Sequence, residues 1–234
     1  MLEDILKDGF SQMGLSCDDR MLERYRIYFG ALEETNKVMN LTAISGEEDV
    51  ARLHFLDCAA LLCSAELAGK SVIDVGTGAG FPGLALKIAC PDIKLTLLDS
   101  LDKRIGFLRR TCAELGFADV ECLHARAEEA PKELREGFDY AVSRAVARLN
   151  LLCELCLPFV KTGGAFIAMK GPDCEEELNE AKKGISLLGG KIEKCVGYTV
   201  PGTDVNHSLV IIRKIKPSPA KYPRRWAQIK KQPL

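Results

Sequence analysis

The sequence predicts a doubly wound α/β sheet, and three observations indicate it. Short apolar runs alternate with helical segments from residue 71 onward, as in sheets whose parallel strands are joined by helices. The first apolar run leads directly into a cluster of glycines, DVGTGAGFPG at 74–83. The last two runs are joined by PGTDVN, which is too short for a crossover helix and therefore predicts an antiparallel hairpin. The expected fold is a mostly parallel sheet of seven strands that ends in this hairpin.

Helices are predicted for the residues that precede the sheet. Leu22, Tyr25, Ile27, Phe29 and Leu32 fall at mixed helical spacings, and HFLDCAALL continues an apolar stripe after the polar link MNLTAIS. We therefore divide the chain into a helical extension at 1–67, a sheet domain at 68–215 and a basic tail at 216–234.

Each element of the sheet domain has its own signal. SVIDV is a short apolar run that ends in an acid, which is typical of a buried parallel strand. The helix at 101–116 has an apolar stripe and a glycine placed to end it, and the helix at 174–190 has acids in its first turn. The predicted strands are 71–75, 94–100, 120–125, 138–145, 164–171, 191–200 and 207–215, and the predicted helices between them are 83–90, 101–116, 149–160 and 174–190.

Composition bounds the class of protein. Hydrophobic residues make up 47% of the 234 residues and charged residues 28%, as in ordinary globular proteins, and no apolar run is long enough for a transmembrane helix. The start, MLEDILKDGF, is acidic and lacks the pattern of a signal peptide, so we expect a cytoplasmic protein. The ten cysteines are irregularly spaced and are expected to be thiols, and Cys153 and Cys156 fall in an apolar helix that predicts burial rather than a metal site.

The charge is unevenly distributed. Residues 213–234 contain eight basic residues and no acid, which leaves 24 basic and 33 acidic residues, a net charge of −9, in the rest of the chain. Such a tail suggests a polyanionic partner such as RNA, and equally suits a solubilising extension. Prolines at 217, 219 and 223 predict an extended, mobile arm. Lys221, Arg224 and Arg225 are its candidate phosphate contacts.

The glycine cluster discriminates between two ligand classes. A dinucleotide-binding loop, G-x-G-x-x-G, would require a third glycine where Phe81 stands. The observed pattern is D-x-G-x-G-x-G, formed by Asp74, Gly76, Gly78 and Gly80, and it is typical of class I S-adenosylmethionine-dependent methyltransferases, which have a Rossmann-like fold. Asp74 could serve a cationic ligand.

Acids at later strand ends support a nucleoside ligand. Asp99 ends the second strand, 19 residues after Gly80, where a carboxylate can accept two hydrogen bonds from a ribose diol. Ala127 and Glu128 follow the third strand, where the adenine edge is expected. Enzymes that bind NAD also have an acid at the end of the second strand, where Asp99 stands. An NAD-dependent oxidoreductase therefore remains an alternative, which Phe81 disfavours.

The fourth strand bears on the methyl acceptor. VSRAVARL contains no N/D-P-P-Y/F motif of the kind that polarises an exocyclic amine, and no cysteine next to a proline stands there as a nucleophile. These absences favour a methyl acceptor that already has a free lone pair, such as nitrogen 7 of guanine. Methylation of such an atom needs positioning of the acceptor more than a general base. Methyltransferases of small molecules also lack these motifs, so a small-molecule substrate stays open.

Seven segments together resemble one family. The runs NLTAI, HFLD, DVGTGAGFPG, LLDSLDKRIGFL, RAE, SRAVA and GGAFIAMKG resemble the bacterial RsmG family, also called GidB, over roughly residues 36–215. The resemblance implies transfer of a methyl group from S-adenosylmethionine to nitrogen 7 of one guanine in 16S rRNA. It implies 16S rRNA or the small ribosomal subunit as the partner, with no DNA or membrane partner, and we expect a monomer.

The resemblance also implies site residues. It places Gly76, Phe81, Asp99, Ser100, Leu101, Ala127, Glu128 and Arg144 at the cofactor. Arg144 could contact the cofactor carboxylate, hold an RNA phosphate or form a structural ion pair. Asn40, Thr42 and His54 either face the target base or cap their helices. No residue is assigned a catalytic role.

Overall fold

The predicted α/β sheet is confirmed by a computed structural model of the chain, which describes residues 1–144 and 147–234. The strand order is β3-β2-β1-β4-β5-β7-β6. Strands β3 to β5 pair in parallel, whereas β7 pairs antiparallel with both β5 and β6, as the hairpin predicts. The strands are β1 (Ser71–Val75), β2 (Lys94–Asp99), β3 (Glu121–His124), β4 (Phe138–Arg144), β5 (Val160–Lys170), β6 (Gly190–Thr199) and β7 (Asn206–Lys214). Ala145, the last residue of the predicted fourth strand, and Val146 of the SRAVA run lie outside the described residues.

Helices precede the sheet and join its strands, as the sequence predicts. Cys153 and Cys156 are both fully buried in one of them, α7. The α-helices are α1 (Leu2–Gln12), α2 (Asp19–Met39), α3 (Glu47–Val50), α4 (Asp57–Ala59), α5 (Gly83–Ala89), α6 (Asp102–Glu114), α7 (Leu149–Cys156), α8 (Glu175–Leu187) and α9 (Trp226–Lys231). A π-helical turn, η1 (Ala51–Leu56), joins α3 to α4, and short 3-10 turns lie at η2 (Ala60–Cys63), η3 (Ala127–Glu129), η4 (Lys132–Leu134) and η5 (Leu157–Phe159).

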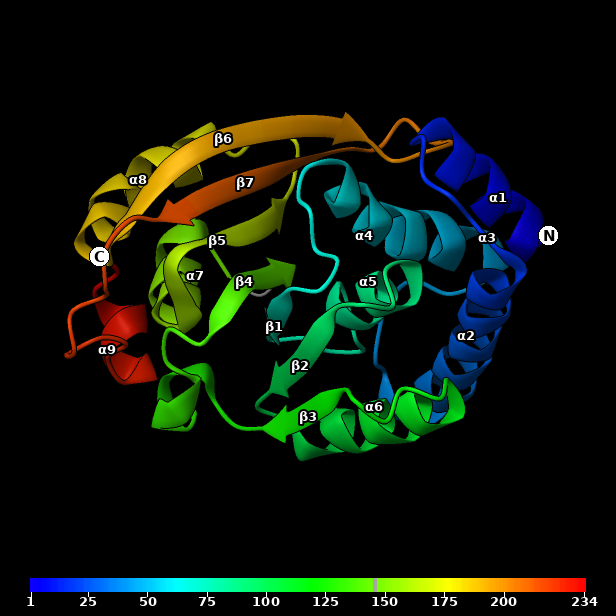
Figure 1. The fold of residues 1–234 in the computed structure, drawn as a ribbon, viewed down its shortest axis with the longest axis horizontal. Coiled ribbons are helices and arrows are strands. Elements are labelled where there is room, and N and C mark those ends of the chain that lie inside the picture. The colour runs from blue at the N-terminus through cyan, green and yellow to red at the C-terminus, as the bar shows by residue number, and fades with distance from the viewer. Residues whose placement is uncertain (145–146) are drawn as a thin grey trace.

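Two apolar cores lie on opposite faces of the sheet. Helices α1, α2, α5 and α6 pack on one face around buried residues such as Tyr25, Phe55 and Leu108. Helices α7 and α8 and the tail pack on the other around residues such as Leu152 and Ile185. Figure 1 shows α1 and α2 with the N-terminus on the right, and α7, α8 and α9 with the C-terminus on the left. The sheet is therefore covered on both faces, as a parallel sheet requires.

The helical extension is bonded to the glycine cluster. Asp18 begins α2 by accepting a hydrogen bond from the Met21 amide at 2.7 Å. Farther along α2, the Tyr28 hydroxyl donates to the Ala79 carbonyl at 2.6 Å, and the Tyr25 hydroxyl donates to the Ala85 carbonyl at 2.9 Å. Both tyrosines are fully buried. These bonds fix α2 against the loop that follows β1 and against α5.

The tail differs from the extended arm that its prolines predict. Residues 226–231 form α9, and Tyr222 and Ile229 are buried in the second core. The Arg224 guanidinium pairs with the fully buried Glu154 of α7 at 2.6 Å, and the Arg224 amide donates to the same carboxylate at 2.8 Å. The prediction of a mobile arm is wrong because the prolines precede α9 instead of interrupting it, and a buried acid holds the segment.

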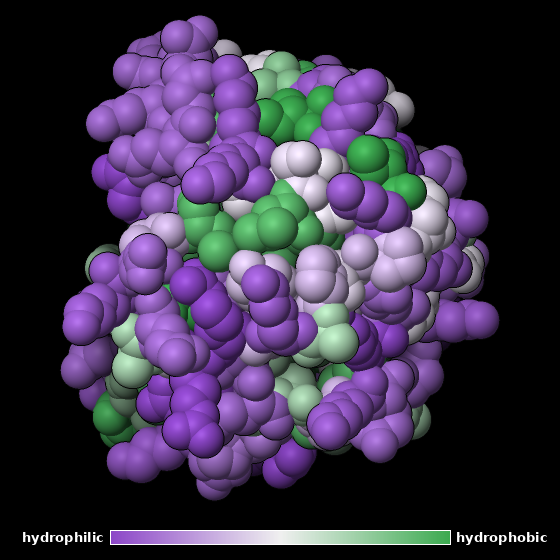
Figure 2. Space-filling model, turned by 90° about the vertical axis from the view of Figure 1, so that its left-hand side faces the viewer, coloured by the Kyte–Doolittle hydropathy of each residue, from purple (hydrophilic) through white to green (hydrophobic). Residues whose placement is uncertain are grey.

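The surface beside the tail is mainly hydrophilic. Figure 2 shows the face on which α8 and α9 lie, where hydrophobic residues gather near the centre and toward the top among hydrophilic ones. Lys221, Arg225 and Lys230 of the tail are exposed. None of the helices in the described ranges is both long and apolar enough to span a membrane.

Candidate functional site

A cavity of about 550 Å³ opens at the carboxyl ends of β1, β2 and β4, where the strand order reverses between the paired strands β1 and β4. In open α/β sheets, ligands bind at this reversal of strand order. We call it the glycine-loop cavity. It is lined by Leu41, Thr42, His54, Val75, Gly76, Thr77, Gly78, Ala79, Phe81, Leu98, Asp99, Ser100, Arg104, Ala125, Arg126, Ala127, Glu128, Arg144, Leu155 and Trp226.

The glycine loop needs its glycines for two different reasons. Gly76, Gly78 and Gly80 all have positive φ, at 74°, 60° and 106°, a region that favours glycine. A Cβ added at Gly78, which lines the cavity, meets no atom within 4 Å. A Cβ at Gly80 would lie 2.5 Å from the Tyr28 hydroxyl. Gly78 thus keeps cavity space open, whereas Gly80 allows α2 to approach the loop.

Asp74 lies beneath the loop and does not line the cavity. It is fully buried, and its Oδ2 accepts hydrogen bonds from the Thr77 hydroxyl at 2.6 Å and the Gly83 amide at 2.7 Å. Its Oδ1 has no partner within the part of the chain that the structure describes. Burial raises the pKa of Asp74 to about 7. The structure therefore gives Asp74 a part in shaping the loop.

Asp99 lines the cavity and connects two loops. Its Oδ2 accepts from the Gly78 amide and its Oδ1 from the Leu101 amide, both at 2.9 Å, and Arg104 approaches Oδ2 at 3.5 Å. A carboxylate has about four acceptor positions, so both oxygens can still accept hydrogen bonds from a ribose diol.

We expect the Asp99→Ala variant to lose cofactor affinity. Hydrogen bonds to a charged group contribute roughly 1.5–3 kcal/mol each, so each lost bond should lower affinity about ten-fold or more. Loss of the Gly78 and Leu101 contacts should add to the effect by loosening both loops. Calorimetric titration with S-adenosylhomocysteine measures the change, and an unchanged dissociation constant would remove Asp99 from the site.

The remaining predicted cofactor residues divide into two groups. Ser100, Ala127 and Glu128 line the cavity together with Phe81. Leu101 is 51% exposed and lies outside the lining. Phe81 occupies the position where a dinucleotide loop would have its third glycine, and its ring stacks on His54 with centroids 4.2 Å apart.

Arg144 and His54 form one wall of the cavity. The Arg144 guanidinium contacts His54 Nδ1 at 2.7 Å, and since arginine can only donate, Nδ1 is the acceptor. His54 Nε2 then carries the ring proton and donates to the Thr42 hydroxyl at 2.8 Å. Burial and the Arg144 charge lower the pKa of His54 to about 3, so the ring is neutral at physiological pH.

Asp57 is a central site residue that sequence reasoning missed. It is 1% exposed and accepts from Arg144 at 2.9 Å, from Tyr198 at 2.6 Å and from His207 at 2.7 Å. Burial alone would raise the pKa of Asp57, but the His207 hydrogen bond and the Arg144 charge hold it below its ordinary value. The hydrogen bond to Asp57 raises the pKa of His207. The HFLD segment contained the signal, because an acid there lies one helical turn after His54.

A second cavity, of about 450 Å³, shares Arg144 and His54 with the first. We call it the Lys170 cavity. It is lined by Ile44, Leu53, His54, Asp57, Arg144, Met169, Lys170, Gly171, Glu177, Val205 and His207. The two cavities therefore adjoin across the Arg144–His54 wall.

The other substrate candidates lie at different places. Thr42 lines the glycine-loop cavity, while the exposed Asn40 ends α2 with a φ of 47°. The Asn36 side chain, which sequence reasoning passed over, bonds both the amide and the carbonyl of Thr42. Lys221 and Arg225 are exposed outside both cavities, whereas Arg224 is paired with Glu154. Sequence reasoning did not assign Thr77, Arg104, Arg126, Leu155 or Trp226 to the lining of the glycine-loop cavity.

Comparison with known proteins gives a family and close relatives. The family model described as GidB, rRNA small subunit methyltransferase G, matches residues 21–202. A ribosomal RNA small subunit methyltransferase G from Alkaliphilus metalliredigens is 49% identical over 233 residues, covering 98% of each chain. The protein of the same name from Clostridium botulinum strain Loch Maree is 47% identical over 234 residues, covering 99% of this chain and 98% of that one.

Solved structures share the fold at low identity. The precorrin-6y C5,15-methyltransferase of Geobacter metallireducens has a TM-score of 0.52 at 15% identity, covering 74% of this chain and 92% of its own. The YcgJ protein of Bacillus subtilis has a TM-score of 0.53 at 15% identity, covering 71% of this chain and 100% of its own. Such distant likeness supports the α/β fold alone.

Proposed function

The chain belongs to the GidB family, the rRNA small subunit methyltransferases G, and from this membership we propose which of its residues hold the cofactor and the RNA. It is an S-adenosylmethionine-dependent methyltransferase that modifies nitrogen 7 of a guanine in 16S rRNA. The open space above Gly78 in the glycine-loop cavity carries the cofactor assignment, because backbone without a side chain lets a nucleoside lie against the loop.

The cavity fits S-adenosylmethionine in volume and in chemistry. Its volume of about 550 Å³ lies within the usual range for small-molecule sites. The Asp99 carboxylate suits the ribose hydroxyls, and Glu128 suits the adenine amino group. We propose as cofactor contacts Gly76, Gly78, Phe81, Asp99, Ser100, Leu101, Ala127, Glu128 and Arg144. Asp74 and Gly80 are proposed to shape the loop.

The reaction needs positioning and no general base. When bound, S-adenosylmethionine supplies a methyl group to the lone pair of guanine nitrogen 7, and the carbon–sulfur bond breaks with its electrons leaving on sulfur. No proton has to be removed before attack. The neutral His54 suits this task, because it holds Arg144 and Thr42 in place without adding positive charge beside the sulfonium.

Transfer of a labelled methyl group to RNA tests the function. The purified enzyme is incubated with isolated small ribosomal subunits or with protein-free 16S rRNA, and the label is mapped. We expect label on nitrogen 7 of a single guanine. Absence of transfer to both substrates, with cofactor binding intact, would favour a small-molecule methyltransferase, the alternative with the same fold.

Exposed cations of the tail are proposed to contact RNA phosphates. We expect the triple variant Lys221→Ala, Arg225→Ala and Lys230→Ala to flatten the dependence of log affinity on log salt by up to about 2, since each contact to single-stranded RNA contributes about 0.7. All three side chains are exposed, unlike Arg224. Filter binding of the rRNA substrate over a range of salt concentrations measures the slope.

A matched control for the tail variant replaces three cations on the opposite side of the molecule. Lys7, Arg20 and Lys37 are three exposed cations of α1 and α2, and their replacement by alanine should leave the slope unchanged. If the tail variant retains the wild-type slope, the tail is a solubilising extension.

We propose that three segments of the chain have different roles. Residues 1–67 contribute Thr42, His54 and Asp57 to the site, residues 68–215 hold the cofactor, and residues 216–234 face the RNA. We propose that the enzyme acts as a monomer. Because the proposed substrate belongs to the small ribosomal subunit, we propose a cytoplasmic enzyme with no membrane or DNA partner.

A further inference from the structure

We propose that the Lys170 cavity holds the target guanine, and that Glu177 and Lys170 read its Watson–Crick edge. The inference rests on the proposed function and adds to it the residues that select the base. A target base must lie beside the methyl group, and the Lys170 cavity adjoins the glycine-loop cavity across Arg144 and His54.

The walls of the Lys170 cavity suit a flat heterocycle. Ile44, Leu53, Met169 and Val205 supply apolar surface, and polar groups converge between them. An apolar pocket with a few placed polar groups is the usual form of a site for a small planar ligand, and about 450 Å³ is ample for one base.

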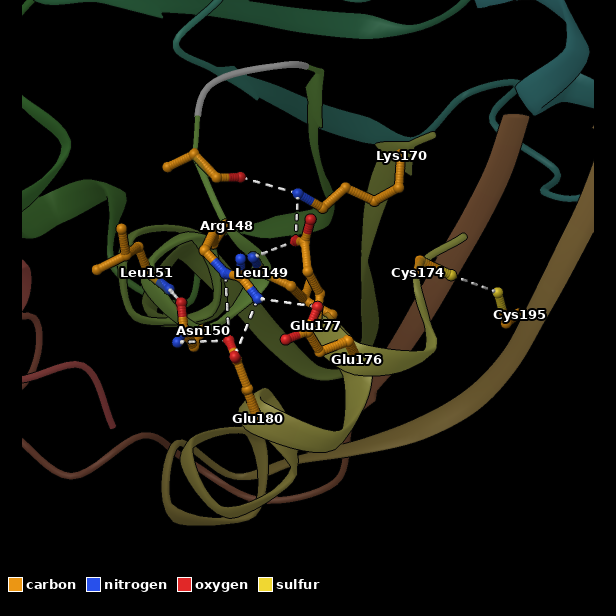
Figure 3. A network of polar contacts seen from close by, with 11 residues as sticks. Arg148, Leu149, Asn150, Leu151, Lys170, Cys174, Glu176, Glu177, Glu180 and Cys195 are labelled. Carbon is orange, nitrogen blue, oxygen red and sulfur yellow. Dashed lines mark hydrogen bonds and ion pairs between the residues drawn. The ribbon is translucent and has the colours of Figure 1, made fainter. Parts of the chain in front are cut away.

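Lys170 and Glu177 leave one donor and one acceptor available. The Lys170 ammonium, whose side chain is 9% exposed, donates to the Ala147 carbonyl at 2.8 Å and pairs with Glu177 Oε2 at 2.7 Å. The Leu149 amide donates to that same oxygen at 2.7 Å. Figure 3 shows both donors converging on the Glu177 carboxylate. Across residues 1–144 and 147–234, Glu177 Oε1 has no hydrogen-bond partner, and Lys170 has a third N–H to donate.

The other carboxylate that lines this cavity, Asp57, already has hydrogen-bond donors within the protein. Asp57 accepts from Arg144, Tyr198 and His207. Burial alone would raise the pKa of Glu177, but the hydrogen bonds from Lys170 and the Leu149 amide hold it below its ordinary value. Glu177 is therefore the ionised acceptor that a ligand in the cavity can reach.

This donor and acceptor match guanine and reject adenine. Guanine presents an acceptor, O6, beside two donors, the N1–H and the N2 amino group; O6 lies between nitrogen 7 and N1, and the two donors lie on the side of the purine away from nitrogen 7. With nitrogen 7 turned toward the cofactor, that edge points into the Lys170 cavity, where Lys170 donates to O6 and Glu177 accepts from N1 and N2. Adenine would oppose Lys170 with an amino group and offer Glu177 no N1–H.

The arrangement also favours the product's charge. Methylation of nitrogen 7 leaves a positive charge on the purine and makes N1–H a stronger donor. A carboxylate at N1 therefore stabilises the transition state more than the ground state, which raises kcat as well as affinity.

The test compares two RNAs and three proteins. The RNAs are a 16S fragment with guanosine at the mapped target and the same fragment with inosine, which lacks only the N2 amino group. The proteins are wild type, Glu177→Gln and Glu176→Gln. In Glu177→Gln, the amide oxygen is held by Lys170 and the Leu149 amide, so the amide nitrogen turns a donor toward guanine's donors. Glu176 lies in the same turn of α8, with an 81% exposed side chain, and is the matched control.

Wild type should methylate the guanosine RNA with a kcat/KM about ten-fold above that for inosine. Glu177→Gln should lose about 10- to 100-fold on guanosine RNA, with the ratio between the two RNAs falling toward one. Glu176→Gln should behave as wild type, and all three proteins should bind S-adenosylhomocysteine equally. Because guanosine and inosine differ slightly in intrinsic reactivity, the change in the ratio between wild type and variant is the decisive quantity.

Two results would overturn the inference. The first is that wild type methylates guanosine RNA and inosine RNA with equal kcat/KM, a result that does not depend on whether any variant folds. The second is that Glu177→Gln lowers kcat/KM for the two RNAs by the same factor. Absence of transfer to guanosine RNA by wild type would instead overturn the proposed function, and the inference with it.

Discussion

Valine in place of Gly78 should lower the affinity for S-adenosylhomocysteine at least about 100-fold, or roughly 2.7 kcal/mol, while the sheet stays folded. The side chain would project into the cavity space that Gly78 leaves open. A β-branched residue also resists the φ of 60° that the loop has there. Calorimetry measures the affinity, and circular dichroism reports the fold.

Gly116 provides the control for backbone strain. Its φ of 72° is similar and a Cβ there also meets nothing within 4 Å, but it follows α6 outside the cavity. Gly116→Val should therefore destabilise the fold by a similar amount and keep the cofactor affinity. Wild-type affinity in Gly78→Val would mean that the loop is only a turn.

Alanine in place of Arg224 should destabilise the fold by about 3 kcal/mol or more, because it leaves a buried carboxylate without its cation. Glu154 is fully buried, and Arg224 bonds it through the side chain at 2.9 and 2.6 Å and through the backbone amide. For a chain of this length, the melting temperature should fall by roughly 6–12 °C. Cofactor affinity should weaken too, because Trp226 of the adjoining α9 lines the glycine-loop cavity.

The neighbouring arginine is the matched control. Arg225 is exposed, and Arg225→Ala should change the melting temperature little. Thermal unfolding of Arg224→Ala and Arg225→Ala measures the two melting temperatures. Equal melting temperatures would show that the Arg224–Glu154 pair contributes nothing net to stability.

The sheet and the glycine loop could be predicted because their signals are local. Alternating apolar runs indicate parallel strands, and the spacing of Gly76, Gly78 and Gly80 is complete within five residues. The family resemblance then identified Ser100, which carries no pattern of its own. Ser100 lines the cavity.

Contacts between distant segments could not be predicted. Asp57 is an isolated acid in an apolar helix, and its partners Tyr198 and His207 lie 141 and 150 residues away. The prediction of a mobile tail was wrong for the same reason. Its charges and prolines suggested an arm, because the acid that neutralises Arg224 is hidden in LNLLCELCLPFV, 70 residues earlier. Composition describes a segment alone, whereas packing depends on its partner.

The contacts of Asp57 with Arg144, Tyr198 and His207 also affect when the enzyme becomes functional during synthesis. A nascent chain displays its N-terminal helices first, so Asp57 leaves the ribosome long before the hairpin that carries Tyr198 and His207. Until β6 and β7 pair with the sheet, Asp57 lacks two of its three hydrogen-bond donors, Tyr198 and His207. Long-range contacts of this kind form late in folding. The wall between the two cavities is therefore completed only when nearly the whole chain has been translated, and incomplete chains should not methylate RNA.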